Sequence, residues 1–284
     1  MRIVSLTCSN TEIVCALGCA EMLVGVDDHS DFPADVVADL PRVGPDLGVD
    51  PEKVAALEPD LVLASLTVPG HEKVVAAIED AGLPYVAPRP QSLADVARDV
   101  RDIAVRLGVA ERGEEVAASM QEAFDVLRRE GEETAALAAG RAPASIMVQW
   151  WPKPVIAPGR ASWAHDLLEL VGATHPLAEE AVESRPLEDE EVAALRPDAF
   201  VLAWCGVEPH KVRPDVVRSN PTFGDLPAIR EDHVYCVPEA WLGRPSPRLV
   251  HGARALREVV AGIAGAPVRP ALRDPRLWRQ GLDG

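Results

Sequence analysis

The sequence lacks the features of several common protein classes. No apolar run approaches the ~20 residues that a membrane-spanning helix needs. It contains no glycine-rich phosphate-binding loop, no nucleophile elbow and no recognisable pair of catalytic carboxylates, and Cys205 has no identifiable base. We therefore expect neither enzymatic activity nor direct insertion into a membrane.

Basic residues are scarce. The chain has 45 acidic and 28 basic residues among 284, a net charge of −17, while 48% of the residues are hydrophobic. This balance disfavours a nucleic-acid or anionic-membrane surface and is typical of a globular protein with a substantial core. We expect a monomer with a solvated acidic surface.

Cysteines are few, and their number is odd. The five thiols, Cys8, Cys15, Cys19, Cys205 and Cys236, indicate a reducing compartment and buried core side chains rather than a disulfide framework. Met1 and Arg2 lead directly into an apolar segment, without room for a signal peptide. As it stands, the sequence predicts a cytoplasmic protein; a periplasmic or extracellular location applies if a leader was removed.

Metal-ligand clusters are also missing. The seven histidines are scattered, several of them in or beside expected helices, so a zinc or manganese receptor is not favoured. They are His29, His71, His165, His175, His210, His233 and His251. We expect no catalytic cofactor and no resident metal.

What the sequence does contain is an alternation of short apolar strands and helices, which predicts parallel βαβ units. The expected strands are Ile3–Leu6, Leu23–Val26, Leu61–Ala64, Pro84–Ala87, Ser145–Gln149, 199–204 and Val234–Val237. Ser9 or Asn10 is expected to cap the first helix, and the last helix is expected to run from about Ser246 to Ala264.

Residues 110–140 predict one long amphipathic helix. Val116, Met120, Phe124 and Leu127 recur at helical spacing between polar residues. Roughly 28 helical residues extend about 42 Å. Glycines at 113 and 131 weaken the prediction, because glycine costs a helix interior about 1 kcal/mol relative to alanine.

A weak internal repeat flanks this helix. The segments 52–60 (EKVAALEPD) and 190–198 (EEVAALRPD) each end at a Pro-Asp turn and lead into an apolar strand. We therefore predict an α/β fold of two Rossmann-like lobes joined by a single long helix. The expected parts are an N-terminal lobe over 1–109, the connecting helix over 110–140, a C-terminal lobe over 141–265 and an irregular tail over 266–284.

Four tryptophans follow the predicted strands of the second lobe, in a chain that is only 4% aromatic. Ligands bind beyond the carboxyl ends of strands in open α/β sheets. Trp150, Trp151, Trp204 and Trp241 therefore indicate a site for a wide, flat, partly apolar ligand. Packing inside the lobe is the alternative for any one of them.

Several of these segments carry a family resemblance. The order of Ser9–Glu12, His29–Pro33, Glu52–Asp60, Gln149–Gly159, Glu190–Asp198 and Arg244–Arg248 resembles that of the cobalamin-binding proteins of ABC importers. These belong to the helical-backbone periplasmic-binding-protein group (class III substrate-binding-protein architecture), which also includes siderophore and haem binders. The resemblance covers residues 1–264 and implies two α/β lobes joined by one rigid helix.

The resemblance also implies roles for individual residues. Glu52 and Glu190 match glutamates that dock onto arginines of the permease, although both would also suit the first turns of solvated helices. His29, Trp150 and Trp241 match ligand-facing positions. Asp46, Ser65 and Ser184 depart from the pattern, because tryptophans are expected there, whereas Trp151 and Trp204 are additional. Coordination of cobalt or iron by His29 is a further option.

The predicted function is capture of a corrinoid, such as cobalamin, between the two lobes for import by an ABC permease. The first alternative is a haem or ferric-siderophore binding protein, for which Arg160, Arg244 and Arg248 supply cations; Arg244 is included in the predicted ligand site. The second is a cytoplasmic corrinoid-binding protein without a permease.

Overall fold

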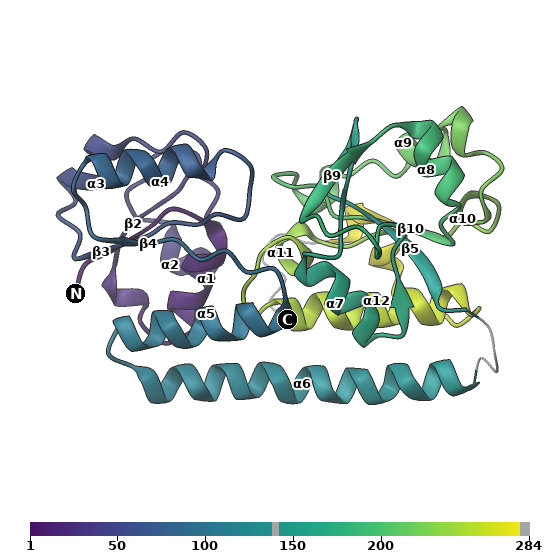
Figure 1. Ribbon diagram of the computed structural model, residues 1–284, viewed down its shortest axis with the longest axis horizontal. Helices are drawn as coiled ribbons and strands as arrows, with labels where there is room; N and C mark the ends of the chain where they lie inside the picture. Colours follow the sequence, from purple (N-terminus) through teal and green to yellow (C-terminus); the bar gives the residue numbers. More distant parts are fainter. Residues whose placement is uncertain (138–141, 279–284) are drawn as a thin grey trace. The chain divides into compact units, whose positions relative to one another are not determined.

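The computed structural model describes residues 1–137 and 142–278. The chain forms two compact units, each an α/β structure (Figure 1). Unit 1 comprises residues 1–90, 94–120 and 245–247, and unit 2 comprises 91–93, 121–244 and 248–284. The chain therefore passes between the units several times, once within the long helix and again around residues 244–248.

Unit 1 is built on a four-stranded parallel sheet in the order β2-β1-β3-β4. Its strands are β1 (Ile3–Ser5), β2 (Leu23–Val26), β3 (Leu61–Leu63) and β4 (Tyr85–Val86). Its helices are α1 (Cys8–Ala16), η1 (Ala20–Met22), α2 (Ala34–Val37), α3 (Pro51–Ala56), α4 (His71–Asp80) and α5 (Leu93–Arg106). Val4, Val62, Val54 and Ile78 join strands and helices in one core.

Unit 2 contains a second parallel sheet in the order β11-β10-β5-β8 and a three-stranded antiparallel sheet in the order β6-β7-β9. The strands are β5 (Ala144–Gln149), β6 (Trp151–Pro152), β7 (Val155–Pro158), β8 (Ala173–Thr174), β9 (Ser184–Leu187), β10 (Ala199–Leu202) and β11 (Val234–Cys236). The longer helices are α7 (Trp163–Leu170), α8 (Asp189–Leu195) and α12 (Leu249–Ile263). The shorter ones are η2 (Pro209–Lys211), α9 (Asp215–Arg218), η3 (Pro221–Phe223), α10 (Pro227–Arg230), α11 (Glu239–Leu242), η4 (Pro270–Leu272) and η5 (Pro275–Leu277).

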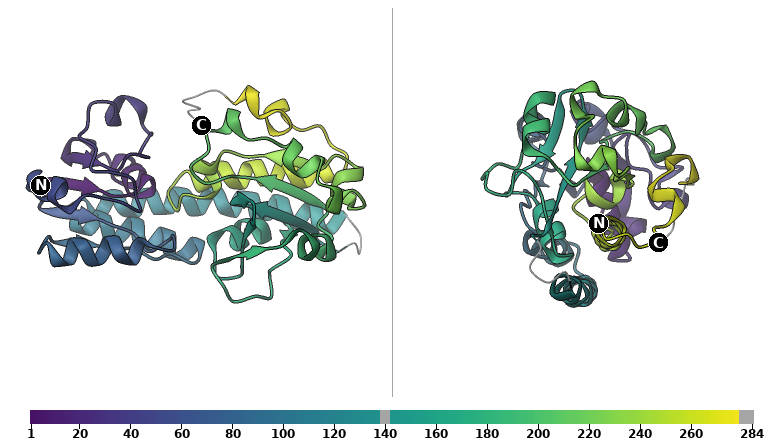
Figure 2. Two further views of the ribbon diagram at one scale, coloured as in Figure 1. Left: turned by 90° about the horizontal axis from the view of Figure 1, so that it is seen from above. Right: turned by 90° about the vertical axis from the view of Figure 1, so that its right-hand side faces the viewer.

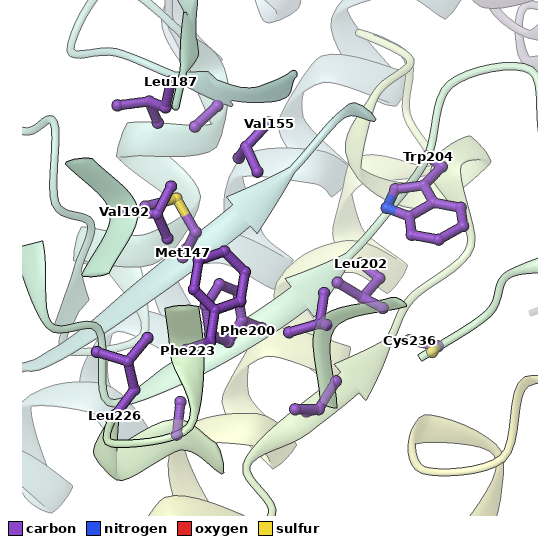
Figure 3. Packing of buried hydrophobic residues seen from close by; sticks show 14 of the residues in the cluster. Met147, Val155, Leu187, Val192, Phe200, Leu202, Trp204, Phe223, Leu226 and Cys236 are labelled. Atoms are coloured by element: carbon purple, nitrogen blue, oxygen red, sulfur yellow. The ribbon is translucent and has the colours of Figure 1, made fainter. Parts of the chain in front are cut away.

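The core of unit 2 lies between its parallel sheet and the helices that cover it. Phe200 and Phe223 stack with ring centroids 5.5 Å apart, and Met147 and Leu226 pack around them (Figure 3). Helices α7 and α12 pack together in the same unit (Figure 1). The segment after α12 turns back beside this helix (Figure 2, left), where Arg269 pairs with Glu258.

The predicted long helix is present as α6 (Ala110–Leu137); positions 138–140 of the prediction lie outside the described residues. Its two glycines are sites of close approach. A Cβ atom on Gly113 would lie 2.4 Å from the Cβ of Ala104 in α5, and one on Gly131 would lie 2.7 Å from the carbonyl oxygen of Leu170 at the end of α7. The glycines that weakened the helix prediction are therefore where neighbouring elements contact the α6 backbone.

The internal repeat is also visible in hydrogen bonding. In unit 1 the Asp60 carboxylate accepts the Arg2 N–H at 2.7 Å, and the Asp60 N–H donates to the Arg2 carbonyl. In unit 2 Asp198 makes the same two bonds with Ser145. Glu58 and Arg196, two residues earlier, both have φ of 47°. The two segments thus anchor equivalent strands in equivalent ways.

Two local predictions were wrong. Helix α1 begins at Cys8, so Ser9 and Asn10 lie inside its first turn; the Asn10 amide instead donates to the carbonyl oxygens of Leu63 and Ala64. Helix α12 begins at Leu249, after Ser246, a residue of unit 1 whose hydroxyl donates to buried Glu12 at 2.5 Å.

Candidate functional site

In unit 1, the loop after β2 carries His29 and is held by buried polar groups. Asp27 is fully buried, and its carboxylate accepts hydrogen bonds from the Ser30 hydroxyl at 2.5 Å and the His29 N–H at 3.0 Å. Burial raises the pKa of Asp27, and these two donors oppose that rise. Arg42 donates to the carbonyl oxygens of Asp27 and Ser30, both at 2.7 Å. The backbone of the loop is therefore fixed.

The His29 ring lies beside a carboxylate shared by two histidines. Asp46 Oδ1 is 3.7 Å from His29 Nε2, and Asp46 Oδ2 is 3.5 Å from His71 Nε2. His71 Nδ1 accepts the Val68 N–H at 3.3 Å, so the neutral ring carries its proton on Nε2, facing Asp46. The contact with His71 lowers the pKa of Asp46 despite partial burial. At 3.5 Å the contact is too long for a good hydrogen bond, and His71 Nε2 has no hydrogen-bond partner among the described residues.

These polar groups are bordered by exposed apolar side chains. His29 is about half exposed, whereas His71 is buried. Leu47 is 52% exposed and Val68 is 40% exposed, although both are large and apolar. The loops after β2 and β3 therefore present an imidazole next to apolar surface, which suits a ligand that is flat and only partly polar.

In unit 2, the last residues of three neighbouring parallel strands are paired with one another, so the carboxyl ends of these strands are level. Leu202, the last residue of β10, pairs with Gln149 at the end of β5 and with Cys236 at the end of β11. The segments that follow, with Trp150, Trp204 and Trp241, therefore leave from one edge of the sheet. This is the arrangement that the sequence predicted for the tryptophans.

The tryptophans differ in exposure. Trp151 lies in β6, pairs with Ile156 of β7 and is 41% exposed, and Trp150 is partly buried. Trp204 is 6% exposed within the core of unit 2 (Figure 3), and its Nε1–H points to Gln149 Oε1 at 3.4 Å. Trp241 is 4% exposed. Of the four indoles, only those of Trp150 and Trp151 contribute appreciable surface.

Arg244 does not present an uncompensated cation. Its Nε donates to Glu239 Oε2 at 3.1 Å, and both side chains are largely buried. Arg160, by contrast, is exposed after β7. An anionic ligand at Arg244 would compete with a carboxylate already bonded to it.

The two predicted docking glutamates are exposed at equivalent places in the repeat. Glu52 lies in the first turn of α3, where Asp50 caps the helix by accepting the Glu52 N–H at 3.0 Å. Glu190 lies in the first turn of α8, and its side chain is exposed. Both carboxylates are therefore available to a partner.

Neither a metal cluster nor a membrane span is found within residues 1–137 and 142–278. No group of three or more His, Cys, Asp or Glu side chains is arranged there to hold a metal ion. No helix in those ranges is both long and apolar enough to cross a bilayer. The five cysteines are all reduced thiols.

Sequence reasoning missed the contacts of Asp46 and His71 with the His29 loop, and it missed Trp278 altogether. His71 directly follows Gly70, a residue with φ of 107° that precedes α4. A histidine at the start of a helix after a parallel strand was the available signal, because such positions lie at the carboxyl edge of the sheet.

Comparison with known proteins identifies the class. The model of the periplasmic binding protein family matches residues 3–240, and the chain belongs to this family. That match confirms the resemblance found in the sequence.

Individual relatives are similar over most of their length. An uncharacterized ABC transporter substrate-binding lipoprotein, YvrC, of Bacillus subtilis is 27% identical, covering 91% of this chain and 79% of the relative. A vitamin B12-binding protein of Vibrio parahaemolyticus is 24% identical over 88% of this chain and 86% of its own length. The apo periplasmic heme-binding protein RhuT of Roseiflexus sp. RS-1 matches with a TM-score of 0.77 and 26% identity, over 93% of this chain and 98% of that chain. These matches confirm the predicted fold class of two α/β lobes sharing one long helix.

Proposed function

We propose that this chain is the substrate-binding protein of an ABC importer and that its ligand is a corrinoid. The observation that carries the proposal is the set of side chains beyond the carboxyl ends of the parallel strands in each unit. In unit 1 these are His29, Leu47 and Val68, and in unit 2 they are Trp150 and Trp151. Apolar and aromatic surface with few charges suits a large macrocycle whose periphery carries neutral amides. The role is binding and delivery rather than catalysis.

Within this proposal the predicted site residues take different parts. His29, Trp150 and Trp151 contact the ligand, whereas Trp204 and Trp241 are buried and offer it little surface. Arg244, neutralised by Glu239, helps to hold the loop after α11. Glu52 and Glu190 contact arginines of the permease, which contributes orientation and association rate.

Haem is the second candidate, and His29 is the observation that favours it. Its imidazole is half exposed and lies in a loop fixed by Asp27 and Arg42. An exposed imidazole is a common ligand of metal ions such as iron. The similarity to a heme-binding protein at 26% identity supports the same candidate.

The test is a direct comparison of ligands. Purified protein is titrated with cobalamin, cobinamide, haemin and a ferric hydroxamate, followed by visible spectra and calorimetry. We expect a stoichiometric complex with a corrinoid that survives desalting. Binding of haemin alone, with a shifted Soret band that His29→Ala abolishes, would replace the corrinoid by haem.

Removal of one indole should weaken the complex. Trp151→Ala deletes the most exposed of the site tryptophans, and we expect the Kd for the corrinoid to rise about fivefold, since one aromatic contact contributes about 1 kcal/mol. His210→Ala, which removes another part-exposed ring in unit 2, is the control and should leave the Kd unchanged. Equal affinities for the wild type and Trp151→Ala would contradict the assignment of β6 to the site.

A further inference from the structure

The stretch from Val268 to Trp278 lies beyond the part of the chain that matches the family, yet it is firmly docked on unit 2. Arg269 Nε donates to Glu258 Oε1 at 2.8 Å. Arg273 donates to the Asp232 carbonyl oxygen at 2.5 Å, and its guanidinium lies 4.9 Å from the centre of the Tyr235 ring. Leu272 is fully buried. We call this stretch the C-terminal strap.

The C-terminal strap leads to the edge of the sheet where the site lies. Its first helix, η4, packs against β11, and its second, η5, packs against η2, the helix that follows β10 and Trp204. The Trp278 Nε1–H then donates to the carbonyl oxygen of Cys236, the last residue of β11, at 3.1 Å. The strap therefore ends at the carboxyl edge of the parallel sheet.

At that edge Trp278 covers Trp241. The two indoles meet edge to face, with ring centroids 5.1 Å apart and planes at 85°. The His251 ring also lies against Trp241, with a centroid separation of 5.4 Å. Trp241 is 4% exposed and Trp278 is 5% exposed. The strap thus removes Trp241 from the surface offered to a ligand.

The C-terminal strap is held at several points along its length. Trp278 is buried, its N–H is bonded, and the strap is held upstream by Arg269, Leu272 and Arg273. Releasing the strap would expose two indoles of roughly 150–250 Å² each and break several charge-assisted bonds. A ligand that displaced the whole strap to reach Trp241 would have to offset these losses.

We propose that Trp278 is a specificity-determining residue of the ligand site, since it closes the β11 end of the sheet edge and leaves Trp150 and Trp151 as the open end. This inference rests on the proposed function. It implies that the space available to a macrocyclic ligand is limited by the chain's own C-terminal strap.

The test compares full-length Trp278→Ala, Trp278→Phe and Leu277→Ala proteins with the wild type. Leu277 is the matched control, because it is the last residue of η5, next to Trp278, but is 51% exposed. Affinities for cobalamin and cobinamide are measured by calorimetry, and exposure of indoles by acrylamide quenching of fluorescence. Cobinamide lacks the nucleotide loop and is the smaller ligand.

We expect Trp278→Ala to increase quenching and to raise the ratio of cobalamin to cobinamide affinity at least threefold, with a smaller rise for Trp278→Phe and none for Leu277→Ala. If Trp278→Ala does not fold, the Trp278→Phe result decides.

If the wild type binds corrinoids and the folded Trp278 variants have the same ratio of cobalamin to cobinamide affinity, this inference is overturned and the proposed function is not. Absence of corrinoid binding by the wild type and all variants would overturn the proposed function and the inference together. If Trp278→Ala binds a corrinoid and the wild type does not, the result would support the inference that Trp278 limits the site. It would overturn the proposal that the wild type binds a corrinoid.

Discussion

One buried histidine of unit 2, His175, has a pKa that makes it sensitive to acid. His175, in the loop after β8, accepts the Leu177 N–H on Nδ1 at 3.2 Å, and its Nε2 has no hydrogen-bond partner among the described residues. The His165 ring lies against it, with centroids 5.5 Å apart. Burial, with a smaller contribution from the charge of His165, lowers the pKa of His175 to about 4.

This shift predicts a loss of stability in acid. Because His175 has its ordinary pKa of about 6.5 in the unfolded chain, the unfolded state binds more protons between pH 6.5 and 4. We expect the contribution of His175 to the free energy of unfolding to fall by about 2–3 kcal/mol over that window, as measured by urea denaturation of the wild type against His175→Asn. His175→Asn keeps an acceptor for the Leu177 N–H and should give a flatter profile, whereas His210→Asn should follow the wild type. If the free energy of unfolding depends on pH in the same way in all three proteins, the loss of stability in acid is not caused by His175.

At the scale of secondary structure, the glycines of α6 act through close packing. Gly131→Ala would gain up to about 1 kcal/mol of helix propensity, but the new methyl group would lie 2.7 Å from the Leu170 carbonyl oxygen and 3.0 Å from the Val171 carbonyl carbon. These are backbone atoms, so relief requires movement of the end of α7.

We therefore expect Gly131→Ala to lower the free energy of unfolding by about 1–2 kcal/mol, since overpacking outweighs the gain in propensity. Ser119→Ala, at an exposed position of the same helix, is the control and should be neutral or slightly stabilising. Thermal and urea denaturation measure both. Stabilisation by Gly131→Ala would show that α6 moves away from α7 at no cost.

The elements that sequence reasoning predicted correctly are those determined by local pattern. The parallel strands, the long helix and the repeat follow from apolar period, turn residues and length. The antiparallel sheet of β6, β7 and β9 was missed, because Pro152 and Pro154 argue against a strand and its pairing joins residues as distant as Val155 and Leu187. Trp278 was missed for the same reason: its partners, Cys236 and Trp241, are far away in sequence.

At the scale of the whole molecule, the two exposed glutamates are proposed to act together. Glu52→Lys combined with Glu190→Lys reverses both charges at equivalent positions of the repeat, so docking onto basic permease residues should fail. We expect uptake of labelled cobalamin to fall at least tenfold when this variant replaces the native gene in the source organism, with the Kd for cobalamin unchanged.

Charge reversal elsewhere provides the control. Glu111→Lys combined with Glu122→Lys changes two exposed carboxylates on α6 by the same net charge and should leave uptake intact. Normal uptake by the Glu52 and Glu190 variant would instead favour a corrinoid-binding protein that works without a permease. Equal loss in both double variants would indicate a general effect of net charge.

The tight glycine contacts of α6 also constrain how this protein can change in length. Eighteen residues separate Gly113 from Gly131, about five whole turns at 3.6 residues per turn, so both glycines lie on the same face of the helix. Insertion or deletion of one residue between them would rotate one glycine by about 100° relative to the other, so that the two would no longer share a face of α6. Only indels that approximate whole turns would keep both contact glycines on one face of α6.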